Sequence, residues 1–144
     1  MESKPLEILL VEDNPADVML LEDFMRRSKV INNLNAVENG AQALDYLYKK
    51  GKYADVKTPH LILLDLNMPI KGGREVLAEI KENTALKHIP IIVLTSSQGE
   101  QDIFNSYALH ANCYLSKPTD LEQFHKMMSA IEYFWMHLVK LPNR

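Results

Sequence analysis

Short apolar runs alternate along the chain with stretches whose apolar residues recur at helical spacing. Strands are predicted at residues 7–11, 34–37, 60–64, 90–94 and 113–116. Helices are predicted to begin near residue 14 and near residue 39, and to cover residues 74–83, 98–109 and 120–139. Because strands and helices alternate regularly, the pattern indicates an α/β fold with a parallel sheet covered on both faces.

Local signals mark where two of the helices begin and where the sheet ends. Asn14 and Asn39 are good N-caps, and Pro15 suits the first position of a helix. The run at 34–37 is less apolar than the other runs, so it is predicted to be an edge strand. The polar stretch 49–58 is predicted to be an exposed loop and the longest connection in the chain.

Polar residues directly follow four of the predicted strands. They are Glu12 with Asp13, then Asp65, Thr95 and Lys117. Because the carboxyl ends of parallel strands meet at one edge of a sheet, we expect these residues to form a single site. Each residue alone has an ordinary explanation as a helix cap, a strand residue or a surface charge. Their joint placement at four strand ends favours a shared function.

These residue types together indicate phosphoryl chemistry. Three neighbouring carboxylates repel one another unless a cation is bound, and hard oxygen ligands at an open sheet edge favour Mg²⁺. Asp65 follows the most apolar run and is the predicted nucleophile, whose attack on phosphorus would give an aspartyl phosphate. Lys117 and the Thr95 hydroxyl would then stabilise negative charge on the phosphoryl oxygens.

Length, charge and cysteine content exclude several classes of protein. The 144 residues, 47% of them hydrophobic, are predicted to form one domain over 1–144, with a core at about 6–139 and a tail at 140–144. A formal net charge of −3 provides no basic field to hold nucleic acid. Cys113 is the sole cysteine, which suits a reducing cytosol. No apolar stretch approaches the roughly 20 residues that span a bilayer, so we expect a cytoplasmic protein without a nucleic-acid or membrane partner.

The strand-end residues closely resemble the motifs of the receiver domain of two-component response regulators. Residues 8–14 resemble the first strand of that domain with its acidic pair, and residues 65–69 resemble its phosphoacceptor strand and loop. Thr95 matches the switch hydroxyl of the family, and Tyr114 matches its switch aromatic residue. Lys117 matches the lysine of the family, and the bond between Lys117 and Pro118 matches the cis peptide bond that follows that lysine.

The resemblance, which covers residues 6–139, implies a flavodoxin-like (βα)5 three-layer sandwich with sheet order 2-1-3-4-5. It implies Mg²⁺ bound by Asp13, Asp65 and the carbonyl of Asn67, with Glu12 acting through water. Asp65 would accept a phosphoryl group from a histidine kinase. The protein would be a signalling switch and not an enzyme, because it would catalyse only its own phosphoryl transfer and dephosphorylation. Glu12 stands where aspartate is commoner, and its longer side chain is expected to preserve metal binding.

Within this family, the long loop and the aromatic tail at 133–138 look most like single-domain regulators paired with cyanobacterial phytochrome histidine kinases. The implied partner is therefore a phytochrome-type histidine kinase. The signal is expected to pass through the surface of the receiver itself, which changes when Thr95 moves toward the phosphoryl group and Tyr114 rotates into the vacated space. Considered alone, Tyr114 is better explained as a half-buried aromatic residue of a strand.

The last predicted helix carries more apolar residues than one helix face can bury. Tyr133, Phe134 and Trp135 are predicted to form a homodimer interface, because exposed apolar patches commonly mark such interfaces. Packing of these side chains onto the chain's own sheet is the alternative.

Two other functions are compatible with an aspartate nucleophile at a strand end. One is a Mg²⁺-dependent phosphohydrolase of the haloacid-dehalogenase type, although Asn67 stands where such enzymes carry a second acid. The other is a receiver that serves as a scaffold without being phosphorylated, against which the presence of Asp65, Thr95 and Lys117 argues.

Overall fold

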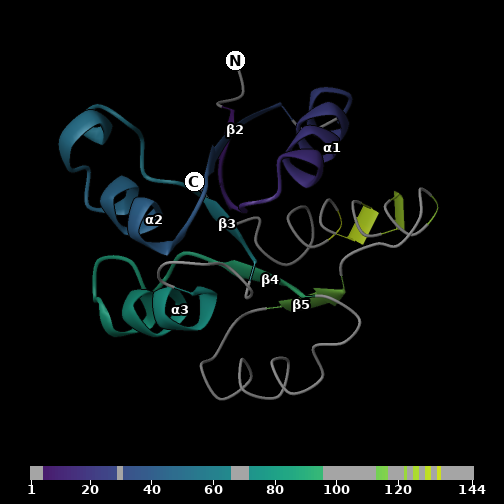
Figure 1. Cartoon of the computed structure of the whole chain (residues 1–144). Helices are drawn as coiled ribbons and strands as arrows, with labels where there is room; N and C mark the ends of the chain where they lie inside the picture. The colour runs from purple at the N-terminus through teal and green to yellow at the C-terminus, as the bar shows by residue number, and fades with distance from the viewer. Residues whose placement is uncertain are drawn as a thin grey trace.

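The computed structural model describes residues 5–28, 31–65, 72–95 and 113–116, together with six helical positions between 122 and 133. Five parallel strands form one sheet in the order β2-β1-β3-β4-β5 (Figure 1). The strands are β1 (Leu6–Val11), β2 (Asn32–Val37), β3 (Leu61–Asp65), β4 (Ile91–Thr95) and β5 (Cys113–Ser116). The helices are α1 (Pro15–Arg26), α2 (Gly40–Leu47) and α3 (Gly73–Glu82), with a 3-10 turn, η1, at Gly51–Tyr53. The order of the strands confirms the flavodoxin-like arrangement.

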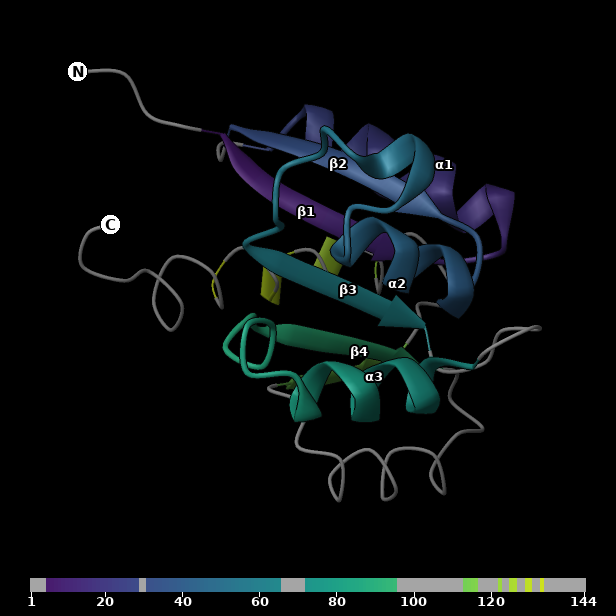
Figure 2. The same ribbon diagram turned by 90° about the vertical axis from the view of Figure 1, so that its left-hand side faces the viewer.

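Helices cover both faces of the sheet, as Figure 2 shows with α2 and α3 in front and α1 behind. Alternate residues of each central strand enter different cores. In β1, Leu9 and Val11 pack with α2 and α3, whereas Ile8 and Leu10 pack with α1. Since successive side chains of a strand point to opposite faces, a strand buried on both sides needs apolar residues at consecutive positions and not at alternate ones. This requirement explains the continuous apolar runs of β1 and β3.

The edge strand and the helix caps confirm the local predictions. β2 lies at one edge of the sheet, where its mixed composition exposes several side chains to solvent. Asn14 begins α1 because its side chain accepts hydrogen bonds from the backbone N–H groups of Ala16 and Asp17, at 2.9 and 3.3 Å. Asn39 begins α2 in the same way, accepting from the N–H of Gln42 at 2.9 Å. These bonds satisfy amides that have no partner inside the helix.

The segment 49–58 differs from the exposed loop that its polar sequence predicted. It contains the turn η1, and both Tyr53 and Val56 are half-buried against the core. The ring of Tyr53 lies 5.2 Å from the ring of Tyr46 on α2. The prediction was wrong at these two positions because their apolar surface packs onto a helix that precedes them in the chain.

The remaining differences are small, and several predictions fall beyond the described residues. β2 begins two residues earlier than predicted, because Asn32 and Asn33 pair with the start of β1. The predicted helix at 98–109 and the peptide bond before Pro118 lie outside the described residues. The six described positions between 122 and 133 are helical, in agreement with the predicted last helix. Among the described residues, no helix is long and apolar enough to cross a membrane.

Replacing Ile80 on α3 tests how much the front core contributes to stability. Ile80 is fully buried, so Ile80→Ala is expected to lower the free energy of unfolding by about 2–5 kcal/mol through a cavity that the surroundings fill only partly. The matched control is Glu82→Ala at the exposed end of the same helix, with an expected change within about 0.5 kcal/mol. Urea unfolding followed by circular dichroism measures both changes, and equal effects of the two substitutions would contradict the proposed packing.

Candidate functional site

Three acidic side chains meet at the carboxyl ends of β1 and β3. Each of Glu12, Asp13 and Asp65 offers a carboxylate oxygen, and these oxygens lie within 4.8 Å of one another. Glu12 and Asp65 are each only 1% exposed, whereas Asp13 faces solvent. The cluster therefore has a buried floor and an open side, and the expected proximity of the three acids is confirmed.

Strand register brings these acids together. Val11 of β1 lies opposite Leu64 of β3, so the next residues on the two strands, Glu12 and Asp65, end side by side. The N–H of Glu12 donates to the carbonyl of Val37 at the end of β2, at 3.0 Å, which extends the pairing of β1 by one residue. The position of Glu12 is thus fixed by backbone pairing with a neighbouring strand.

Asn14 contributes to the site in a way that the sequence analysis missed. Its backbone N–H donates to Oε2 of Glu12 at 3.2 Å, while its side chain caps α1. One residue therefore orients an acid of the cluster and places the N-terminus of a helix next to it. The partial positive charge of that terminus favours nearby negative charge. The signal was present in the sequence, since a predicted N-cap directly follows the acidic pair.

The donor set fits a divalent metal ion. Two ionised carboxylates at 4.8 Å, the largest separation that the cluster allows, repel by about 0.9 to 3.5 kcal/mol when the effective dielectric constant lies between that of water and that of a protein surface. A cation at the centre would convert this repulsion into attraction. Oxygen ligands alone, without histidine or cysteine, favour hard ions such as Mg²⁺, Mn²⁺ or Ca²⁺.

The other predicted site residues are described only in part. Thr95 ends β4, and it pairs in register with Ser116, the residue before Lys117. Tyr114 lies within β5, opposite Val93. The backbone thus places Thr95 at the same sheet edge as Asp65, which lies opposite Leu94.

The remaining predicted residues divide between the described and undescribed parts of the chain. Asn67, Lys117, Phe134 and Trp135 lie outside the described residues. Tyr133 is described and is an exposed position of the last helix.

Comparison with known proteins places this geometry in a family. Residues 8–129 match the response regulator receiver domain. The response regulator Rcp1 of Synechocystis sp. is 48% identical over 138 residues, which cover 96% of this chain and 94% of Rcp1.

Two solved structures share the fold over nearly the whole chain. The phosphorylated cyanobacterial phytochrome response regulator RcpA has a TM-score of 0.89 at 46% identity, covering 97% of this chain and 100% of that chain. The Mn²⁺-bound form of Rcp1 has a TM-score of 0.88 at 48% identity, covering 96% of this chain and 99% of that chain. The chain therefore belongs to the response regulator receiver domain family and is related to phytochrome response regulators.

Proposed function

We propose that this protein is a phosphorylation-dependent signalling switch whose phosphoacceptor is Asp65. The observation that carries the proposal is the group of three carboxylates within 4.8 Å, in which Asp65 is held rigidly at the end of a buried strand. A rigid nucleophile beside a cation site and a helix N-terminus is suited to phosphoryl transfer, which depends mainly on positioning and on neutralising charge.

The residues that would hold Mg²⁺ are Asp13, Asp65 and the carbonyl of Asn67, with Glu12 acting through water. The three carboxylates of this set supply the hard oxygen donors that the ion prefers. When bound, Mg²⁺ would neutralise charge on the acids and on the oxygens of the incoming phosphoryl group. The Mn²⁺-bound structure of Rcp1 supports divalent metal binding in a relative.

In the proposed reaction, a carboxylate oxygen of Asp65 attacks the phosphorus of a phosphohistidine on the kinase. The new P–O bond forms as the P–N bond breaks, and the imidazole keeps the electron pair and takes up a proton. Lys117 would pair with the phosphoryl group, and the Thr95 hydroxyl would donate a hydrogen bond to one of its oxygens. The product is one aspartyl phosphate per chain, without turnover of a substrate.

The phosphorylated state would be read at the surface formed by the predicted helix at 98–109, β5 and the last helix. Movement of Thr95 toward the phosphoryl group and rotation of Tyr114 would change that surface. A coupling free energy of about 1–3 kcal/mol is typical of such switches and is enough for a partner to distinguish the two states.

The proposed partner is a histidine kinase of the phytochrome type, and the proposed compartment is the cytoplasm. The relatives RcpA and Rcp1 support the first assignment, because RcpA is a cyanobacterial phytochrome response regulator. We further propose that the last helix mediates homodimer formation through Tyr133, Phe134 and Trp135. Tyr133, which is 59% exposed in the isolated chain, is available for such a contact.

Metal binding is tested through Asp13. In the absence of divalent ions, Asp13→Asn is expected to raise the free energy of unfolding by about 1 kcal/mol, because it removes repulsion from two neighbouring carboxylates. In the presence of Mg²⁺ or Mn²⁺, the wild-type protein should gain stability and the variant much less. Thermal unfolding with and without chelator measures both effects. Asp45→Asn, on an exposed part of α2, is the control, and a wild-type melting temperature that does not respond to either metal would refute the site.

Phosphorylation is tested with acetyl phosphate in the presence and absence of Mg²⁺. Intact mass spectrometry is expected to show one added phosphoryl group on the wild-type protein only when Mg²⁺ is present, and none on Asp65→Asn. Asp55→Asn, an exposed aspartate outside the cluster, should be labelled like the wild type. Labelling of Asp65→Asn would exclude this acceptor, and continuous consumption of acetyl phosphate at an enzymatic rate would favour a phosphohydrolase.

Self-association is tested by Trp135→Ala. Truncating a central aromatic residue of an interface commonly costs about 2 kcal/mol or more of binding free energy, so the dissociation constant of the dimer should rise at least tenfold. Analytical ultracentrifugation of the phosphorylated and unphosphorylated protein measures the dissociation constant. Glu122→Ala, at an exposed position of the same helix, is the control. A wild-type protein that stays monomeric in both states would disprove the proposed dimer.

A further inference from the structure

A cavity of about 560 Å³ lies along the outer edge of β2, away from the acid cluster. β1 links the two places, because Glu7 near its start lines the cavity and Glu12 after its end belongs to the cluster. Five residues of extended strand span about 16 Å. β2 forms the upper edge of the sheet in Figure 2, between α1 on one face and α2 on the other. The cavity is therefore separate from the proposed phosphoacceptor site.

The wall of this cavity contains a buried carboxylate. Glu7 is only 6% exposed, and its Oε2 accepts a hydrogen bond from Nδ2 of Asn33 at 2.9 Å. Its backbone N–H donates to Nδ1 of His60, and its carbonyl accepts from the N–H of His60. Among the described residues, none forms an ion pair with its carboxylate. Burying a carboxylate without a cationic partner costs stability, which favours a ligand that supplies the missing charge.

Tyr46 lines the same cavity, and its pKa is affected by burial and by the negative charge of Glu7. Burial raises the pKa of Tyr46, and the negative charge of Glu7 raises it further. The hydroxyl therefore stays protonated and keeps a donor at the cavity wall. An aromatic ring next to an acid also suits the aliphatic part and the charged end of a cationic side chain.

The edge of β2 offers backbone groups to an incoming strand. The amide of Leu6 donates to the carbonyl of Ile31, and the amide of Glu12 donates to the carbonyl of Val37, so the odd-numbered residues of β2 pair with β1. By the alternation of a parallel ladder, the backbone N–H and C=O groups of Leu34 and Ala36 point away from β1. Such an exposed edge is a ready template for another strand.

The sequence of this edge is unusual for a strand. Asn32, Asn33 and Asn35 occupy three of its six positions and all line the cavity, although asparagine is depleted in strands. Positions that break a local preference are often functional. Asparagine amides carry both donors and acceptors, so they suit the peptide groups of a ligand.

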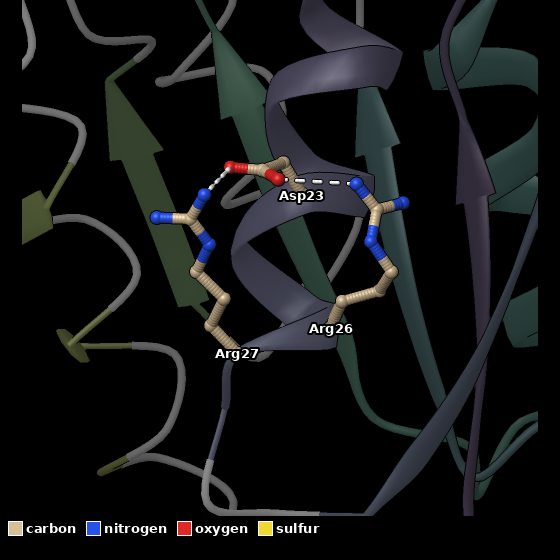
Figure 3. Close-up of polar contacts among 3 residues, drawn as sticks. All are labelled: Asp23, Arg26 and Arg27. Carbon is tan, nitrogen blue, oxygen red and sulfur yellow. Dashed lines mark hydrogen bonds and ion pairs between the residues drawn. The ribbon is translucent and has the colours of Figure 1, made fainter.

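The charges at the rim are Glu22, Arg26 and Lys57. The guanidinium of Arg26 is engaged by Asp23, at 3.0 Å, and the other oxygen of Asp23 holds Arg27 at 3.4 Å (Figure 3). Lys57 forms no ion pair with any residue that the structure describes. Among the charged lining residues that the structure describes, Glu7 is therefore the buried one, and Lys57 is an exposed cation that competes with a ligand for it.

We propose that the cavity and the outer edge of β2 together bind an extended peptide segment of a partner protein that carries a lysine or arginine. The backbone of the peptide adds to β2 as a further strand, and its basic side chain enters the cavity and pairs with Glu7. An anionic ligand is disfavoured by Glu7 and Glu22. A second copy of this chain is disfavoured because its own β2 contains no basic residue and would bring a second unpaired Glu7.

The experiment is a titration of the ¹⁵N-labelled protein with two capped pentapeptides, followed by NMR. One has the sequence threonine-valine-lysine-valine-threonine, and the other has norleucine in place of lysine. The lysine peptide is expected to shift the backbone amides of Leu34 and Ala36, whose N–H groups acquire hydrogen bonds, and to bind at least tenfold more tightly than the norleucine peptide. No localised shift at millimolar lysine peptide, or equal binding of the two peptides, would overturn the proposal. An equal response to butylamine would exclude strand addition.

Three variants separate this role from a structural one. Glu7→Gln is expected to weaken binding of the lysine peptide at least tenfold and to raise the urea midpoint of the free protein, because a buried unpaired charge is removed. If Glu7 had a purely structural role, Glu7→Gln would instead lower that midpoint, which would overturn the proposal.

Ala36→Pro should abolish binding and leave the fold intact, since an edge strand tolerates proline where its N–H faces outward. Lys57→Met should strengthen binding, and weaker binding would contradict the charge argument.

The outcome is independent of the proposed phosphorylation. Glu7→Gln should accept one phosphoryl group from acetyl phosphate in the same way as the wild type. Loss of peptide binding with normal labelling, or the reverse, therefore identifies which of the two proposals fails.

Discussion

The parallel pairing of β1 with β3 is the constraint on which the site depends. The two strands carry continuous apolar runs, Ile8 to Val11 and Leu61 to Leu64, because helices cover both faces, and a buried acid directly follows each run. Because Val11 pairs with Leu64, the next residues on the two strands, Glu12 and Asp65, lie side by side. The burial that stabilises the sheet thus also holds two carboxylates at a distance that they would avoid in a free peptide.

The start of α1 follows from the same arrangement. The chain must leave the sheet edge directly after Glu12 and Asp13, and Asn14 makes this turn while capping the helix and bonding to Glu12. Local and tertiary preferences therefore agree at this point. Such agreement is expected where a sequence specifies one structure.

The two ends of β1 carry acids in different situations. At the carboxyl end, Glu12 belongs to a cluster whose donor set suits a metal ion, and family relatives include a Mn²⁺-bound structure. At the amino end, Glu7 is buried beside a polar cavity and has one asparagine as its side-chain donor. At the amino end, the sheet holds a negative charge on Glu7 with which no described residue forms an ion pair. The sheet thus tolerates a local loss of stability from buried negative charge, and a bound cationic ligand would reduce that loss.

The sequence by itself determined the five strands, the helices α1, α2 and α3, the helix caps at Asn14 and Asn39, and the edge position of β2, because these depend on composition and on neighbours a few residues away. It also determined that acids follow two buried strands. The tertiary structure alone decided that Tyr53 packs on Tyr46, and that Glu7 lies in a cavity wall instead of in solvent. Both depend on contacts between segments that are distant in the chain, and whether a strand residue is buried depends on what covers the face to which it points. A polar residue at the start of an apolar run gives no sign of that covering, whereas a polar residue after the run shows where the buried strand ends.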